Sequence, residues 1–174
     1  SDKTGTLTMN RMTVEEVLDA GELLDEGGSG RRRRPGRGKG AMAPCQEELL
    51  RAFVLCNDAE LNKKGRIGDP GELAFLEYAE KEGPWTKGEL ERQLPRTAER
   101  AFDPERKRMT TVHRTETGTV SYTKGAPDVI LERCSRYLSG GGERPLTGSS
   151  RRRLQDRISW LSSQGLRVLG AARS

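Results

Sequence analysis

Two runs of β-favouring residues near the middle of the chain, 109–113 and 119–123, flank the turn-forming segment 115–118. Such a pair of runs joined by a short polar turn with Gly is typical of a β-hairpin. A turn centred on the middle of this segment predicts the register His113 opposite Val120, Thr111 opposite Tyr122 and Met109 opposite Lys124. The chain must therefore build an antiparallel sheet, and the segments that enter and leave the hairpin must lie at the same end of it.

Five segments around this hairpin carry apolar residues at helical spacing, and we expect each to form a helix. They lie at 46–57, 70–82 and 86–94, after Pro127, and between Thr147 and Gly165. The second begins with Asp69 as N-cap and has Glu72 at its third position, which is capping-box chemistry. Together with the hairpin, these segments predict an α+β fold, an antiparallel β-sheet flanked by helices.

Additional strands are predicted towards both ends of the chain. Residues 11–25 predict two short strands with Gly21 in the turn between them, and residues 166–171 predict a last strand. A flexible turn is expected at 140–142. No apolar run approaches the ~20 residues that a membrane helix requires. We therefore expect a soluble piece of a longer protein.

A segment of low complexity at 26–44 accounts for the net charge of +5. Six of the 31 basic residues lie between Arg31 and Lys39, so the rest of the chain is close to neutral against 26 acidic residues. A segment this rich in Gly and Arg cannot bury enough apolar area to offset its ordering entropy. We interpret it as a disordered, solvated insert between a strand and a helix.

The cysteines and the single histidine predict structural roles. Cys45, Cys56 and Cys134 are widely spaced and form no CxxC or Cys/His cluster, which argues against structural zinc and against a disulfide framework. They are expected to act as small core hydrophobes. His113 has no second ligand nearby in the sequence and is expected to be a strand side chain rather than a base or a metal ligand.

The first residues of the chain carry the clearest chemistry. Asp2 is followed at once by Lys3, Thr4, Gly5 and Thr6. A carboxylate can attack a phosphoryl group and hold it as an aspartyl phosphate, and this transfer needs positive charge and donors around the moving oxygens. Asp2, Lys3, Thr4 and Thr6 are therefore candidate catalytic residues.

A second informative segment is 102–109, where an aromatic residue precedes a cluster of cations. An aromatic ring can stack on a base, and cations can meet phosphate. Because the hairpin register brings its entry and exit to one end, Phe102, Lys107 and Lys124 can share one site.

Residues 2–8 resemble the phosphorylation motif of P-type ATPases, the ion pumps that pass through an aspartyl phosphate. The segments at 56–59, 69–72, 102–109, 124–128 and 166–171 resemble segments of the nucleotide domain of the same family, in the same order. The continuation at 9–13 is most similar to the calcium and sodium/potassium branch. Residues 56–59 can also be explained as core plus a helix stop, the interpretation that we favour for them.

The resemblance implies specific roles in binding ATP and Mg²⁺. Glu72 would contact the adenine amino group, Phe102 would stack on the base, and Lys124 would lie at the bottom of the cleft. The other positions implied in nucleotide binding are Lys107, Met109, Gly125, Arg167 and Leu169, and Mg²⁺ would be held by Asp2 and Thr4. Pro104 stands where some family members carry a phosphate-binding Arg, and whether Arg106 replaces it stays open.

Taken together, the sequence predicts the ATP-binding domain of a membrane cation pump, with residues 1–10 as the phosphorylation-motif strand and hinge and 11–174 as the nucleotide-binding domain. Its partners would be ATP and the remaining phosphorylation, actuator and transmembrane domains of the same pump. This monomeric cytoplasmic piece would bind ATP without turning it over, and no nucleic acid is expected.

Two alternatives remain open. One is a stand-alone aspartate-nucleophile phosphatase of the HAD type, although Thr4 stands where such enzymes normally place a second Asp as general acid/base. The other is a basic nucleic-acid-binding module built on the arginine insert.

Overall fold

The computed structural model describes residues 11–25, 42–140 and 142–174. Within them the helices are α1 (Ala20–Asp25), α2 (Pro44–Leu55), α3 (Pro70–Glu82), α4 (Lys87–Gln93), α5 (Pro127–Arg133) and α6 (Gly148–Ser163). The strands are β1 (Glu60–Asn62), β2 (Gly65–Ile67), β3 (Arg96–Asp103), β4 (Arg108–Arg114), β5 (Thr119–Gly125), β6 (Arg136–Ser139), β7 (Gly142–Pro145) and β8 (Gly170–Arg173). The predicted α+β class, an antiparallel sheet flanked by helices, is confirmed.

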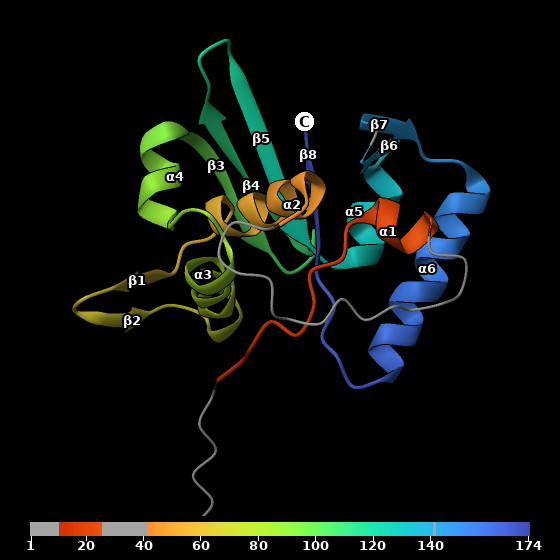
Figure 1. Ribbon diagram of the computed structural model, residues 1–174, viewed down its shortest axis with the longest axis horizontal. Helices are drawn as coiled ribbons and strands as arrows, with labels where there is room; N and C mark the ends of the chain where they lie inside the picture. The colour runs from red at the N-terminus through yellow and green to blue at the C-terminus, as the bar shows by residue number, and fades with distance from the viewer. Residues whose placement is uncertain (1–10, 26–41, 141) are drawn as a thin grey trace, which may run out of the picture.

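The main sheet has the strand order β3-β4-β5-β8, and each neighbouring pair is antiparallel (Figure 1). Its β4–β5 hairpin has the predicted register, with His113 opposite Val120, Thr111 opposite Tyr122 and Met109 opposite Lys124. These odd-numbered positions of β4 are buried, because helices cover this face of the sheet. We refer to it below as the covered face.

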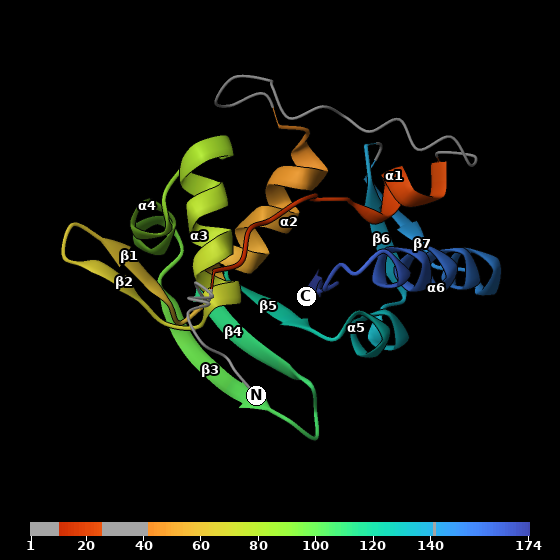
Figure 2. The same cartoon turned by 90° about the horizontal axis from the view of Figure 1, so that it is seen from below.

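Helices α2, α3 and α4 lie on the covered face (Figure 2). The largest core cluster forms between these helices and the sheet. Its main members are Leu50, Val54, Leu55, Leu73, Leu76, Trp85, Leu90, Met109 and Tyr122. The amphipathic pattern predicted for residues 46–57 and 70–82 is therefore the pattern that builds this core.

A second group of elements, α1, α5, α6 and the β6–β7 hairpin, lies beyond β8 in both views (Figures 1 and 2). Leu24, Leu131 and Leu154 form its small core, one residue from each of the three helices. Helix α5 also packs on β8 and so connects this group to the main sheet.

The prediction of two strands in residues 11–25 is wrong. Residues 11–19 form no regular element, and the next six residues form α1. Asp19 explains the change, because its side-chain Oδ1 accepts the N–H of Glu22 at 2.9 Å and its carbonyl accepts the N–H of Leu23 at 3.2 Å. An Asp that satisfies N–H groups in the first turn starts a helix, and Leu24 then reaches the second core.

The last strand was predicted too early, and several strands were not predicted. Strand β8 begins at Gly170, so Arg167 and Leu169 lie before it rather than in it. The β1–β2 and β6–β7 hairpins contain only three or four residues a strand, which is too short for an alternating pattern. Strand β3 lacks alternation for another reason, since it is an edge strand whose residues are mostly exposed.

The helix ends follow the predicted chemistry. Asp69 accepts the N–H groups of Gly71 and Glu72 at the start of α3, and Thr147 accepts the N–H of Ser150 at the start of α6. Gly165 follows the end of α6 with φ +79°, the left-handed conformation that favours glycine.

His113 is a buried strand residue, as predicted. Its Nδ1 lies 2.9 Å from the carbonyl oxygen of Leu94, and its Nε2 lies 2.8 Å from Thr111 Oγ1. Because a carbonyl oxygen can only accept, Nδ1 carries the hydrogen and Nε2 accepts from the threonine hydroxyl. Burial lowers the pKa of His113 below its ordinary value of 6.5.

We expect the stability of the protein to fall as the pH drops below about 6.5. The unfolded chain then binds a proton at His113 that the folded chain does not, so the free energy of unfolding decreases, by at most about 1.4 kcal/mol per pH unit for one proton. Urea unfolding at pH 7.5, 6.5 and 5.5 measures this slope. As the chain has one histidine, His113→Gln should be less stable but nearly independent of pH over this range. A wild-type protein with no slope would contradict the assignment.

Candidate functional site

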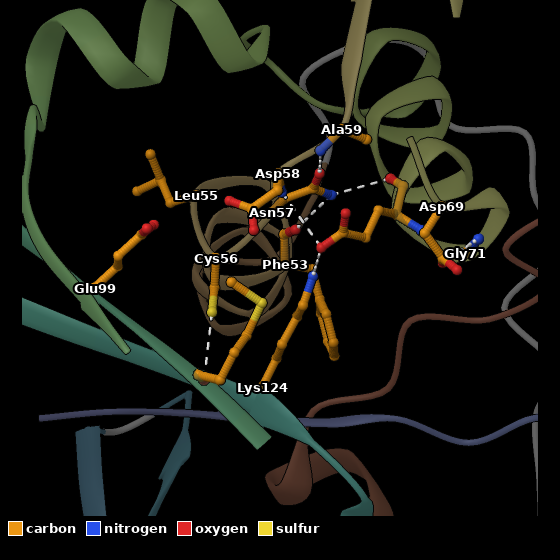
Figure 3. Close-up of polar contacts among 12 residues, drawn as sticks. Phe53, Leu55, Cys56, Asn57, Asp58, Ala59, Asp69, Gly71, Glu99 and Lys124 are labelled. Atoms are coloured by element: carbon orange, nitrogen blue, oxygen red, sulfur yellow. Dashed lines mark hydrogen bonds and ion pairs between the residues drawn. The ribbon is translucent and has the colours of Figure 1, made fainter. Parts of the chain in front are cut away.

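The turn after α2 is held by a fully buried asparagine (Figure 3). Asn57 Nδ2 donates to the carbonyl of Phe53 at 3.1 Å and to the carbonyl of Glu72 at 3.0 Å. Its Oδ1 accepts the N–H of Ala59 at 2.9 Å. One amide side chain therefore ties the end of α2 to the first turn of α3. The interpretation of residues 56–59 as core plus helix stop holds, with this tie in addition.

The carboxylate of Glu72 forms a partly buried ion pair with Lys124, the lysine that Figure 3 labels. The Nζ–Oε1 distance is 2.6 Å, and the two side chains are 12% (Lys124) and 17% (Glu72) exposed. The N–H of Asp58 donates to the same oxygen at 3.3 Å. The other oxygen, Oε2, accepts no hydrogen bond from any residue that the structure describes. Glu72 thus has one oxygen fixed by two donors and one free to accept from a ligand.

The predicted capping box at the start of α3 is formed only in part. Asp69 caps the helix, but the Glu72 side chain turns to Lys124 and Asp58 instead of reaching back to the N–H of the cap. Lys124 explains this choice, because a carboxylate gains direct charge–charge attraction from an ammonium group that the backbone amide of the cap cannot offer.

A β-bulge places Phe102 on the covered face. Arg100 pairs with Thr110 and Asp103 pairs with Arg108, so β3 contains one extra residue between these pairs. Asp103 faces the same side of the sheet as its partner Arg108. Because side chains alternate along a strand, Phe102 faces the opposite side, together with Met109 and Lys124. Its side chain is 57% exposed, unusually open for a phenylalanine. The register therefore places Phe102, Met109 and Lys124 on one face, at the end where Lys124 contacts Glu72. That they form one binding site stays a prediction.

The turn between β3 and β4 carries the other predicted cations. Lys107 is exposed and adopts φ 54°, and its carbonyl accepts the N–H of Ala126 at 3.0 Å. Arg106 Nε is buried without a hydrogen-bond partner in the part of the chain described here. Pro104 is exposed in the same turn. Arg106 and Lys107 thus follow Pro104 within three residues in this turn.

Gly125 has a structural reason to be glycine. A Cβ at this position would lie 2.2 Å from the Lys107 carbonyl oxygen and 2.8 Å from Arg108 Cα. The strands β4 and β5 can approach each other at this end only because the side chain is absent. Its predicted approach to a ligand stays a prediction.

Arg167 and Leu169 line a groove of about 790 Å³, which residues 12–20, helices α2, α3, α5 and α6 and strands β6 and β8 also line. Arg167 Nη1 lies 4.0 Å from Met12 Sδ and 3.8 Å from where a Cβ of Gly71 would be, so it stands at the first turn of α3. Glu72, Lys124, Met109 and Phe102 do not line this groove. The groove is therefore next to the site and distinct from it.

The predicted catalytic and metal-binding residues Asp2, Lys3, Thr4 and Thr6 lie outside the described residues, as do residues 26–41 of the predicted insert at 26–44. The insert was predicted too long at its end, because α2 begins at Pro44. Within residues 11–25, 42–140 and 142–174, no group of three or more His, Cys, Asp or Glu side chains could hold a metal ion. The Mg²⁺ ligands stay predictions.

Sequence reasoning missed two cations that hold the turn after α2. Arg96 Nη2 donates to the carbonyls of Leu55 and Asn57, both at 3.0 Å, and Lys87 Nζ donates to those of Asn57 and Ala59 at 2.9 and 2.7 Å. Burial opposes the charge of Arg96, but hydrogen bonds to Asp58 and Glu99 outweigh it and raise its pKa. No local pattern signals these contacts, since they join positions 28 to 41 residues apart.

Comparison with protein families matches residues 45–174 to the family described as P-type ATPase, cytoplasmic domain N. The chain belongs to this family. The match includes α2 to β8 and therefore every residue of the site described above.

The chain is 35% identical to the calcium-transporting ATPase 1 of Lactococcus lactis and 33% identical to the calcium-transporting ATPase type 2C member 1 of Mus musculus. It is 32% identical to the sodium/potassium-transporting ATPase subunit alpha-2 of Gallus gallus. The alignments cover 98–99% of this chain but only 18–20% of each relative. The chain thus spans about a fifth of the length of these P-type ATPases. None of the helices described here is long and apolar enough to cross a membrane.

We expect Gly125→Ala to destabilise this N domain by about 1–3 kcal/mol, the usual cost of forcing an extra carbon into a packed site. Gly88→Ala is the matched control, because a Cβ there meets nothing closer than 4.0 Å and the residue lies in α4. It should be neutral or stabilising by up to about 1 kcal/mol. Urea unfolding compares the two, and equal stabilities would contradict the close approach of β4 and β5.

Proposed function

We propose that this chain is the ATP-binding domain of an ATP-driven cation pump and that the base of ATP binds at the end of the covered face. The observation that carries this proposal is the Glu72–Lys124 pair, with one carboxylate oxygen free, and the exposed ring of Phe102 at the same end of the covered face. A polar pair with unused hydrogen-bonding capacity next to an open aromatic ring is suited to a flat, polar heterocycle.

The chemistry of Glu72 favours adenine over guanine. The free Oε2 can accept a hydrogen bond from the exocyclic amino group of adenine, and Lys124 can donate to a ring nitrogen. Guanine presents a carbonyl oxygen at the position of that amino group, and this oxygen would face a carboxylate with no hydrogen to share. Stacking on Phe102 adds affinity without choosing between the bases.

The phosphates of ATP would meet the cations around this end of the sheet. Lys107 and Arg106 lie in the turn after Phe102, and Arg167 stands at the first turn of α3. Arg106 has a buried Nε without a partner among the described residues. We infer that Arg106 takes the phosphate contact for which Pro104 offers no side chain.

Calorimetric titration should show that the folded chain binds ATP and that GTP binds more weakly. Phe102→Ala should weaken ATP binding by about 1–3 kcal/mol, the range for losing one base–aromatic stack. Ile67→Ala is the control, because Ile67 is a similarly exposed apolar residue (63%) in β2. Equal ATP affinities for a folded Phe102→Ala protein and for the wild type would remove the proposal.

In the full-length pump, we propose that Asp2 is the residue phosphorylated from ATP. Asp2 would attack the γ-phosphate, with Lys3 and Thr6 neutralising and orienting the transferred group. Asp2 and Thr4 would hold Mg²⁺, which supplies further charge neutralisation. The phosphorylation, actuator and transmembrane domains of the same pump would be the partners of this cytoplasmic domain.

The full-length pump should form an acid-stable, hydroxylamine-labile phosphoenzyme that Asp2→Asn abolishes, because an amide cannot replace the carboxylate as nucleophile. The 174-residue chain alone, incubated with labelled ATP and Mg²⁺, should bind nucleotide without forming this adduct. Phosphoryl transfer needs in-line positioning that we expect other domains to provide. Labelling of the isolated chain at Asp2 would instead favour a self-sufficient, phosphatase-like site.

A further inference from the structure

The end of α2 presents backbone carbonyls that no further helical turn can satisfy. Helix termini leave their last carbonyl groups without intrahelical partners. Here the carbonyls of Leu55, Asn57 and Ala59 accept their hydrogen bonds from the side chains of Arg96 and Lys87. Two cations at this terminus also interact favourably with the negative end of the helix dipole.

Arg96 holds this turn from two sides. While its Nη2 binds the carbonyls of Leu55 and Asn57, its Nη1 binds the carboxylates of Asp58 and Glu99 at 2.8 and 2.7 Å. The planar fork of a guanidinium can make these contacts at once, whereas a lysine ammonium is a single point of charge. Arg96 therefore helps to set the position of the Asp58 backbone, together with Asn57 and Lys87.

Asp58 in turn holds the carboxylate of Glu72, since its N–H donates to Oε1 at 3.3 Å. From these contacts we propose that Arg96 is a positioning residue of the nucleotide site, which orients Glu72 through the backbone of Asp58. Arg96 touches no part of the site directly. Its effect is to keep Oε1 occupied and Oε2 directed to the ligand, so that Glu72 can select adenine.

This inference rests on the proposed function, so its test has one arm without nucleotide. In amide NMR spectra of the wild-type chain, Glu72→Gln should shift the Asp58 N–H resonance, because the charged acceptor is lost. In the Arg96→Met background the same Glu72→Gln change should leave the Asp58 resonance nearly unmoved. Arg100→Met is the matched control, as Arg100 is an exposed arginine of the same strand, and it should retain the full response.

The second arm measures nucleotide affinity. Arg96→Met should bind ATP about tenfold more weakly, the equivalent of one hydrogen bond to a charged group, and its ATP-to-GTP affinity ratio should fall towards one. Arg100→Met should retain both values. Arg96→Lys should restore them in part, because lysine can bind the carbonyls without also fixing Asp58.

Two outcomes would overturn the proposal. One is a folded Arg96→Met protein with an unchanged Asp58 response, and the other is a lost response with an unchanged ATP-to-GTP ratio. If Arg96→Met does not fold, Arg96→Lys serves instead, because it can keep the carbonyl bonds but not the bond to Asp58, and an unchanged Asp58 response in this variant overturns the proposal. If the wild-type chain does not prefer ATP to GTP, the proposed function is wrong. The NMR measurements contain no nucleotide, so they test the role of Arg96 separately.

Discussion

Much of this structure depends on how the chain leaves α2. Asn57 and Ala59 in the turn after this helix are buried, so their backbone polar groups need partners inside the protein. Asn57 supplies some of these partners by binding Phe53, Ala59 and Glu72. Arg96 and Lys87 supply the others. Satisfying one helix end thereby ties α3, α4 and β3 to α2, and the first turn of α3 carries Glu72 of the candidate site.

The Glu72–Lys124 pair shows why a polar site can persist beside the main core. Removing both charges fully from water would cost more than their attraction returns. The side chains stay partly exposed, and Glu72 gains a second donor in Asp58 N–H. The pair is therefore stable enough to hold its geometry, yet it keeps one carboxylate oxygen accessible. A site for a polar heterocycle needs this combination.

Local patterns explain what could be predicted from the sequence. The hairpin register followed from one turn and from alternating residues, and the starts of α3 and α6 followed from Asp69 and Thr147. Helix α1 was missed because Asp19 acts as a cap inside a β-favouring segment. The roles of Arg96 and Lys87 depend on contacts between distant segments, which no short pattern encodes. The candidate site residues came from local chemistry and from the resemblance to a family, whereas the residues that hold them in place could not be predicted from either.

The edge strand β3 illustrates most clearly what a sequence pattern cannot supply. In its middle, Ala98 pairs with Val112 and Arg100 with Thr110, so its even-numbered residues face away from the helices. Register shifts on both sides of this stretch reverse the rule: Arg96 pairs with His113, and Phe102 returns to the side of Met109. Each bulge thus turns one residue onto the covered face. The first turns Arg96, whose guanidinium holds the turn after α2, and the second turns Phe102, whose ring is proposed to stack on the base. Without the bulges, both side chains would lie on the opposite face of the sheet, and the same residues could not form this site.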